Sequence, residues 1–422
     1  MKQDFLAGAA TAAHQVEGNN IHSDNWVMEN LEHSTFKERS GDAVDHYNRY
    51  EEDIRLLAKA GCNVYRFSIE WARIEPEEGA FSEEELDHYR KVIDCCIENQ
   101  IVPIITLHHF SSPAWLIGKG GWCSDYAADA FACYAEYVMQ NLNRKLPYVC
   151  TINEANMGFQ LHKVIEDMMK AMQRAGSVQV GLNMDMDAMM VGVREQAEAF
   201  GCDPDHIHTF LAPRSLEEEV FVMKAHQKAC EAIRKAAPET KVGLTLSLFD
   251  YQAEEGGRET AEQLWYEDFR FYLPYIQNDD FLGVQNYSRK IITADGPKEP
   301  AADAPLTQMG YEDYPASIGH VLEKVSREYS GDLIVTENGI ATDDDERRCA
   351  FIEEAFAGVR RCAENGIPVK GYCYWSLLDN FEWQEGFAKT FGLIAVDRST
   401  QKRYPKRSLS VLGKMKLQMN EI

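Results

Sequence analysis

Short apolar runs alternate along the chain with longer stretches in which apolar residues recur every three or four positions. The short runs predict strands at 5–13, 63–71, 101–109, 148–156, 241–249, 281–288, 333–340 and 369–378. The longer stretches predict helices at 43–60, 82–100, 125–143, 216–237, 258–274, 316–329, 344–365 and near 405–418. Each predicted strand is therefore followed by a helix.

This alternation predicts a parallel sheet, because near-continuous apolar strands are typical of a sheet that is covered on both faces. Eight strand–helix units favour a closed (β/α)8 TIM barrel of the α/β class over an open doubly wound sheet. No glycine-rich phosphate loop follows the first predicted strand, which further disfavours a dinucleotide-binding fold. We expect one domain spanning residues 1–422, with insertions carried by the loops.

Two insertions interrupt the regular pattern. The longer one, 157–215, is rich in methionine, which predicts helical packing by adaptable side chains or, alternatively, a surface that binds a leaving group. The second, 289–315, contains several Pro, Ala and Asp residues, and we expect a surface loop there.

The charge balance narrows the partners. Lys and Arg number 43 against 68 Asp and Glu, a net charge of −25, which argues against nucleic acid and anionic membranes. The 11 cysteines show no zinc-like spacing, and we expect no metal and no cofactor. The first residues do not resemble a secretory signal and no run of 18 apolar residues occurs, so we expect a cytoplasmic protein. The oligomeric state stays open.

Polar residues cluster where the predicted strands end. The run YVCTINEAN places Glu154 after a buried strand, and LIVTENGI does the same for Glu337. A single Asn-Glu often only caps a strand, but two strand-end glutamates in a barrel meet at one crevice. A carboxylate pair without a metal signature fits glycoside hydrolysis. Other polar strand ends are His14-Gln15, Arg66 with Glu70-Trp71, His108-His109, Asn286-Tyr287 and Trp375-Ser376.

Four segments together resemble glycoside hydrolase family 1, the β-glucosidase-like retaining enzymes. FLAGAATAAHQVEG resembles the N-terminal signature of the family, TINEAN its acid/base motif and VTENG its nucleophile motif. YWSLLDNFEW followed by FGLIAVD resembles its C-terminal sugar-binding segment. The segments occur in the order of the family and cover nearly the whole chain.

The resemblance implies a role for each matched residue. Glu337 would attack the anomeric carbon, and Glu154 would protonate the departing oxygen and then deprotonate water. Arg66 would keep Glu337 ionised, Tyr287 would hydrogen-bond it, and Asn153 would hold the sugar 2-hydroxyl. The remaining sugar contacts would come from Gln15, His109, Trp375, Glu382 and Trp383, and the pocket walls from Trp122 and Phe391.

The same resemblance shapes the expected substrate. A carboxylate at Glu382 would repel a phosphate, so we expect an unphosphorylated β-glucoside, with β-galactoside or β-fucoside as further substrates. Alternatives are a catalytically silent sugar-binding barrel, a 6-phospho-β-glycosidase and an endo-acting, cellulase-like barrel. The chain departs from the family at Ala155, where proline is usual, at Ala7, at Phe110 and Ser111, and throughout 157–215, which bears on leaving-group preference.

Overall fold

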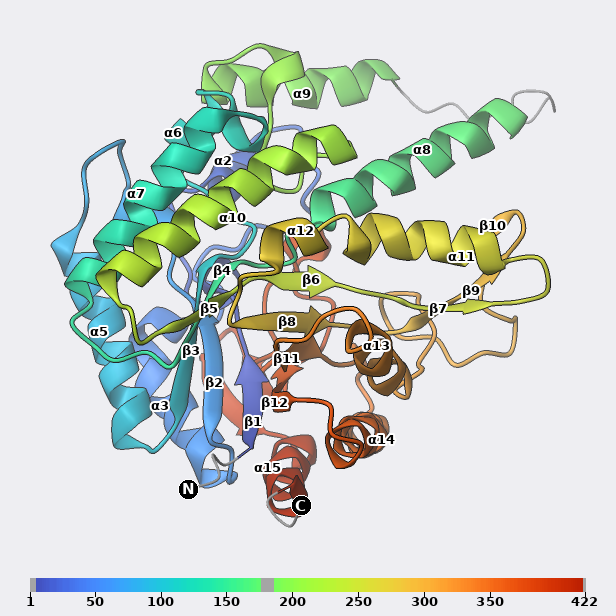
Figure 1. Cartoon of the computed structure of the whole chain (residues 1–422). Coiled ribbons are helices and arrows are strands. Elements are labelled where there is room, and N and C mark those ends of the chain that lie inside the picture. Colours follow the sequence, from blue (N-terminus) through green and yellow to red (C-terminus); the bar gives the residue numbers. More distant parts are fainter. Residues whose placement is uncertain (1–4, 176–185, 420–422) are drawn as a thin grey trace.

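The computed structural model describes residues 5–175 and 186–419, and within them eight parallel strands form a barrel surrounded by helices (Figure 1). The strands are β1 (Leu6–Ala10), β2 (Val64–Ser68), β3 (Val102–His108), β4 (Tyr148–Ile152), β5 (Lys241–Gly243) with β6 (Thr245–Ser247), β8 (Phe281–Gln285), β11 (Asp332–Asn338) and β12 (Val369–Trp375). The hydrogen-bonded order is β5-β4-β3-β2-β1-β12-β11-β8-β6. Because β5 and β6 are two pieces of one predicted strand, the ends of this order meet and the barrel closes. The predicted fold class is confirmed.

The predicted helices are also present. They are α3 (His46–Lys59), α5 (Glu83–Glu98), α7 (Asp125–Asn141), α10 (Leu216–Ala236), α11 (Arg258–Trp265), α13 (Ser317–Val325), α14 (Asp345–Glu364) and α15 (Arg407–Met419). The predicted helix 258–274 is divided, because the π-helical η3 (Tyr266–Arg270) separates α11 from α12 (Leu273–Ile276). Shorter helices are α1 (Ala13–Val16), α2 (Asp24–Asn30), α4 (Trp71–Ile74), α6 (Ala114–Ile117), η1 (Gly121–Cys123), η2 (Pro204–His206) and η4 (Trp383–Glu385). None of the described helices is long and apolar enough to cross a membrane.

Side-chain caps fix where several barrel helices begin. Ser82 accepts a hydrogen bond from the backbone at the start of α5, and Ser124 does so at the start of α7. Ser215 and Glu218 form a reciprocal capping box at α10. These bonds satisfy backbone amides that have no partner inside the helix, so the sequence itself sets the boundary between each loop and its helix.

The inside of the barrel changes character along its axis. An apolar cluster that includes Leu6, Val64, Ile104 and Ile334 fills part of the interior. At the carboxyl end of β2, the buried Arg66 begins a group of polar side chains. Since the carboxyl ends of parallel strands meet on one face, the sequence places its polar residues where a site can form.

The insertion 157–215 forms two helices, α8 (Met157–Ala175) and α9 (Met186–Phe200), which lie beyond the carboxyl ends of the strands (Figure 1). Met169 is 59% exposed and Met190 is 42% exposed, so these two methionines do not pack into the core. Residues 176–185, in the middle of the methionine-rich run, lie outside the described residues.

The expectation of a surface loop at 289–315 is wrong for its first part. β9 (Arg289–Thr293) and β10 (Gly296–Lys298) pair as a hairpin, and β9 also pairs in parallel with β7 (Asp250–Ala253). Ile292 of β9 is fully buried, and its burial stabilises this small sheet. The Lys-Ile-Ile-Thr run therefore forms a strand because β7 offers it both a hydrogen-bonding edge and an apolar contact.

A buried ion pair ties the C-terminal hairpin of β13 (Ile394–Asp397) and β14 (Lys402–Pro405) to α3. Arg403 donates from Nε and from Nη2 to the two carboxylate oxygens of Asp53, at 2.8 and 2.9 Å. Both side chains are completely buried. His46 contacts the same carboxylate, with 2.8 Å between Nδ1 and Oδ2.

We expect Arg403→Met to lower the free energy of unfolding by about 3–5 kcal/mol, because the charge of Asp53 stays buried without its cation. The matched control is Arg407→Met, which removes an exposed partner of Glu346 and costs less than about 1 kcal/mol. Urea unfolding followed by fluorescence measures both. Equal effects of the two changes would contradict this account.

Candidate active site

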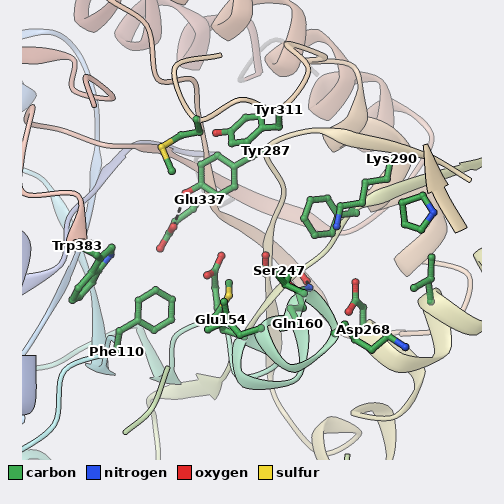
Figure 2. Close-up of a pocket in the computed structure, with 18 of the residues that line it drawn as sticks. Phe110, Glu154, Gln160, Ser247, Asp268, Tyr287, Lys290, Tyr311, Glu337 and Trp383 are labelled. Carbon is green, nitrogen blue, oxygen red and sulfur yellow. Dashed lines mark hydrogen bonds between the residues drawn. The ribbon is translucent and has the colours of Figure 1, made fainter. Parts of the chain in front are cut away.

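Two buried glutamates face one another across a cavity at the carboxyl ends of the strands (Figure 2). Glu337 belongs to β11, and Glu154 follows β4 by two residues. Their exposed fractions are only 3% and 6%. The two strand-end carboxyl groups that the sequence singles out are therefore brought to one place.

Glu337 is held by direct contacts on both oxygens. Arg66 donates from Nη1 to Oε1 at 2.6 Å, and Tyr287 donates its hydroxyl to Oε2 at 2.7 Å. His109 Nε2 lies 4.0 Å from Oε1. Burial beside the Arg66 guanidinium lowers the pKa of His109 well below its usual value, so the ring is neutral.

Arg66 also fixes Asn153, the residue before Glu154. Its Nη2 donates to the Asn153 side-chain oxygen at 2.6 Å, and Gln285 donates to the same oxygen at 2.7 Å. The Asn153 side-chain amide lies 3.2 Å from His109 Nε2. One fully buried guanidinium thus links the strand ends of β2, β4 and β11.

Glu154 occupies a different environment. Its backbone adopts φ = 42°, and its amide donates to Thr245 Oγ1 at 2.8 Å. The next amide, from Ala155, donates to the carbonyl of Thr245 at 3.0 Å. Proline cannot make this second bond because it has no N–H. In this chain a hydrogen bond therefore holds the turn at the position where the family usually has a proline ring.

The two environments separate the glutamates electrostatically. Burial raises the pKa of Glu154 well above its usual value, and the neighbouring charge of Glu337 adds to this effect. Burial also raises the pKa of Glu337, but Arg66 and Tyr287 oppose that rise. Arg66 acts in the predicted direction, although burial has the larger effect. The proton of the pair therefore resides on Glu154.

One end of the cavity is lined by aromatic rings and by Glu382. Trp375 stacks with His109 at 5.6 Å between ring centroids. Gln15 donates from Nε2 to Glu382 at 3.2 Å and to the carbonyl of Phe381 at 2.9 Å. Burial raises the pKa of Glu382 to about 8, with the charge of Glu337 as the next cause.

Several buried polar atoms near the cavity have no protein partner in the described part of the chain. Among them are Gln15 Oε1 and His109 Nδ1. Buried polar groups in proteins are nearly always hydrogen-bonded, so these atoms offer hydrogen-bonding capacity to a ligand rich in hydroxyl groups.

The cavity has a volume of about 390 Å³ and brings most of the predicted residues together. Its lining includes His109, Glu154, Tyr287, Glu337, Trp375, Glu382, Trp383 and Phe391. Gln15, Arg66 and Asn153 are buried behind this lining, in contact with it. Trp122 lies elsewhere, packed between His108 and Phe210, with its indole N–H donated to Ser112.

Sequence reasoning missed a second group of lining residues. They are Phe110, Met157, Gln160, Leu161, Lys163, Val164, Asp167, Ser247, Phe249, Tyr251, Leu264, Glu267, Asp268, Lys290, Pro297, Met309 and Tyr311. The alternation of Ser247, Phe249 and Tyr251 after a strand was an available signal, because side chains two apart share one face. The residues from α8 belong to the insertion 157–215, where the methionine-rich sequence indicated a leaving-group surface as an alternative but did not indicate which positions line it.

Groups able to bind a metal occur outside the cavity in the described residues. One comprises His226, Cys230 and Asp279, and the other comprises Glu32, His33 and Glu195. In each, a carboxylate already pairs with the imidazole, with nitrogen–oxygen distances of 3.2 Å for His226 and 2.7 Å for His33. The expectation of no metal and no cofactor stays a prediction.

Comparisons with known proteins agree with this geometry. The sequence model of Glycosyl hydrolase family 1 matches residues 1–169 and 268–418. Beta-glucosidase A of Thermotoga maritima is 31% identical, with 96% of this chain and 95% of that protein aligned. The 1,4-beta-D-glucan glucohydrolase of Thermotoga neapolitana is also 31% identical, with 96% of each chain aligned.

Solved structures give the same result. The crystal structure of beta-glycosidase BGL167 matches with a TM-score of 0.89 and 41% identity, over 99% of this chain and 97% of that one. The beta-glucosidase of Thermotoga maritima in complex with glucoimidazole matches with a TM-score of 0.80 and 27% identity, over 100% and 99% of the two chains.

We expect Arg66→Met to raise the pKa of Glu337 further, because the cation that opposes the effect of burial is removed. The acid limb of any activity that requires ionised Glu337 would then move to higher pH. Carboxyl ¹³C NMR of glutamate-labelled protein measures the pKa, with Glu337→Gln assigning the signal. Arg66→Lys should give a smaller rise, and an unchanged pKa in Arg66→Met would contradict the proposed contact.

Proposed function

The chain belongs to glycosyl hydrolase family 1, and from that premise we propose that it is an exo-acting, retaining β-glucosidase. The observation that carries the proposal is the unequal pair of buried glutamates. Glu337 is held by Arg66 and Tyr287, whereas Glu154 keeps the proton. Double displacement requires one carboxylate as nucleophile and one carboxylic acid as proton donor.

The positions of the two glutamates then assign the steps of the proposed hydrolysis. Glu337 attacks the anomeric carbon, while Glu154 protonates the glycosidic oxygen and the leaving group departs. Glu154, now ionised, removes a proton from water, and this water releases the sugar from Glu337. Two displacements on opposite faces leave the product in the β configuration.

We assign sugar binding to the end of the cavity that contains Glu382. Gln15, His109 and Glu382 hold hydroxyl groups, and Asn153 holds the 2-hydroxyl beside Arg66. Trp375 provides the stacking face for the ring, with Trp383 and Phe391 beside it. Gln15 Oε1 and His109 Nδ1, which have no protein partner in the described residues, support this assignment.

An unphosphorylated sugar fits this end best. Glu382 lines it, and neither its protonated nor its ionised carboxyl supplies a cation for a phosphate. The nearby Lys389 does not line the cavity. Its ammonium is already occupied, since it donates to the carbonyl of Gln308 at 2.7 Å and lies 3.5 Å from Glu385. β-Galactosides and β-fucosides are proposed as further substrates. The intact pair of glutamates disfavours a silent sugar-binding barrel.

We further propose that residues 1–422 act as one catalytic domain in a reducing compartment, the cytoplasm. All eleven cysteines are free thiols, and eight of them are buried. The net charge of −25 disfavours nucleic acid and anionic membranes as partners.

A panel of 4-nitrophenyl glycosides tests the proposed substrate. We expect turnover of the β-glucoside, weaker turnover of the β-galactoside and β-fucoside, and no turnover of the 6-phospho-β-glucoside, because no Lys or Arg of the described residues lines the sugar end to bind the phosphate. Release of 4-nitrophenol is measured. Turnover of only the phosphorylated substrate would overturn the assignment of Glu382, and silence of the folded protein across the panel would overturn the proposed activity.

Azide distinguishes the roles of the two glutamates. In Glu337→Ala, azide occupies the place of the nucleophile and displaces the leaving group once, so an activated β-glucoside should give the α-glucosyl azide. In Glu154→Ala, azide attacks the glucosyl-enzyme in a second displacement and should give the β-glucosyl azide. Without azide, we expect each variant to lose about 100-fold or more in activity.

The anomeric coupling constant of the isolated azide, measured by proton NMR, identifies each product. The same anomer from both variants would show that the two residues do not divide the roles as proposed. Glu154→Ala should also lose more activity on alkyl glucosides than on 2,4-dinitrophenyl glucoside, because only the poor leaving group needs a proton.

A further inference from the structure

The cavity continues past Glu154, away from Glu382, into a region that we call the distal chamber. Its walls include Met157, Leu161 and Val164 of α8, Phe249 after β6, Leu264 of α11 and Lys290 of β9. In Figure 2, Glu154 lies between Glu337 on one side and Asp268 with Lys290 on the other. A glycoside bound with its sugar at Glu337 therefore directs its leaving group into this chamber.

The wall area of the cavity is mainly apolar, although the polar Gln160 and Ser247 also line it beside Glu154. Three side chains of one face of α8, at positions 157, 161 and 164, point into it, and Phe249 and Leu264 close it from the opposite elements. A second sugar has hydroxyl groups on its whole perimeter, and an apolar wall leaves such groups without partners. An aromatic ring has no hydroxyl groups that would lose hydrogen bonds there, and burial of its apolar surface is favourable.

The far part of the distal chamber contains a cluster of three polar side chains, those of Lys290, Asp268 and Tyr251. The ammonium of Lys290 lies 3.8 Å from the ring centroid of Phe249, and the negative charges of Asp268 and Asp167 also act on it. Burial lowers the pKa of Lys290. Beside it, Asp268 accepts a hydrogen bond from the hydroxyl of Tyr251. Lys290 offers a donor and Asp268 offers an acceptor to a ligand.

The distal chamber is also connected to the acid/base turn. Asn156, two residues after Glu154, donates from Nδ2 to the carbonyl of Ser247 at 2.7 Å and to the carbonyl of Asp268 at 3.0 Å. Asp268 belongs to the π-helical η3, and such segments often occur at functional sites. The position of the chamber wall is thus fixed relative to Glu154.

The charges of the cavity lining limit the chemical class of the ligand, and the extent of the family match shows which wall residues the family model covers. The acidic Asp167 and Glu267 line the cavity together with Lys163 and Lys290, so no net positive charge is available for an anion. Phe249, Tyr251 and Leu264 fall in residues 170–267, which the family model does not match. The match to the family model therefore does not account for these three wall residues.

We propose that the distal chamber selects an uncharged aromatic leaving group with a hydroxyl or carbonyl oxygen at its far end, in preference to a second sugar, and that Lys290 and Phe249 determine this specificity. The inference rests on the proposed β-glucosidase function. Phe249 and the apolar face of α8 hold the rings, and Lys290 donates to the terminal oxygen.

The test compares β-glucosides of phenol, 4-phenylphenol and 4-(4-hydroxyphenyl)phenol, whose leaving phenols have similar acidity. We expect kcat/KM to rise about tenfold from the first to the second through burial of the extra ring. The terminal hydroxyl should add a further factor of about five. Cyclohexylmethyl β-glucoside should have a higher kcat/KM than cellobiose, although its leaving alcohol is the more basic one.

Variants show which residue causes each of the two increases in kcat/KM. Each variant is judged by the ratio of kcat/KM between two substrates, because this ratio does not depend on the fraction of folded enzyme. In Lys290→Met the factor due to the terminal hydroxyl should fall to about one. In Phe249→Ala the factor due to the second ring should fall. The matched control is Lys298→Met on β10, whose lysine pairs with Glu254 outside the cavity lining, and it should keep both factors.

Three results would overturn the proposal. The first is a higher kcat/KM for cellobiose than for cyclohexylmethyl glucoside. The second is an equal kcat/KM for the phenyl and biphenyl glucosides. The third is an increase in kcat/KM from the terminal hydroxyl that is as large in Lys290→Met as in the unaltered protein. Hydrolysis of 4-nitrophenyl β-glucoside in the same preparation shows that the catalytic function stands and that only the inference has failed. No hydrolysis of any glucoside overturns both.

Discussion

The buried guanidinium of Arg66 is the interaction on which the site depends. It contacts Glu337 at 2.6 Å and Asn153 at 2.6 Å, and it is fully shielded from water. A cation in such a position is costly unless it is paired and hydrogen-bonded. Its partners come from β4 and β11, so the barrel must close before the cation is satisfied. The fold and the chemistry of the site are therefore stabilised by the same contacts.

Because Arg66 sits beside only one of the two glutamates, it makes them unequal. Both are buried, and burial alone raises the pKa of each. Only Glu337 makes direct contacts with the cation and the tyrosine hydroxyl, so the proton is left on Glu154. An acid and a nucleophile thus arise from two identical side chains, and their different surroundings assign the proposed roles.

The cavity divides into a sugar end and the distal chamber, which are built in different ways. The sugar end is built from segments that match the family, with Glu382 and Trp383 after the last barrel strand. The distal chamber is built largely from α8, from the residues after β6 and from the small sheet of β7, β9 and β10. Strand ends hold the reacting groups rigidly, while variable connections shape the space for the leaving group.

The sequence by itself determined the barrel, its eight strand–helix units and the two catalytic candidates, because periodicity and strand-end motifs are local properties. It determined only part of the cavity lining: Trp122 packs against His108 and Phe210 instead, and Phe249 and Lys290 enter the lining from separate elements. The strand at 289–293 pairs with β7 on one side and with β10 on the other, and β7 is distant from it in the sequence. Contacts between distant segments exist only after the barrel has closed, so tertiary structure alone decided the proton balance of Glu154 and Glu337 and the shape of the distal chamber.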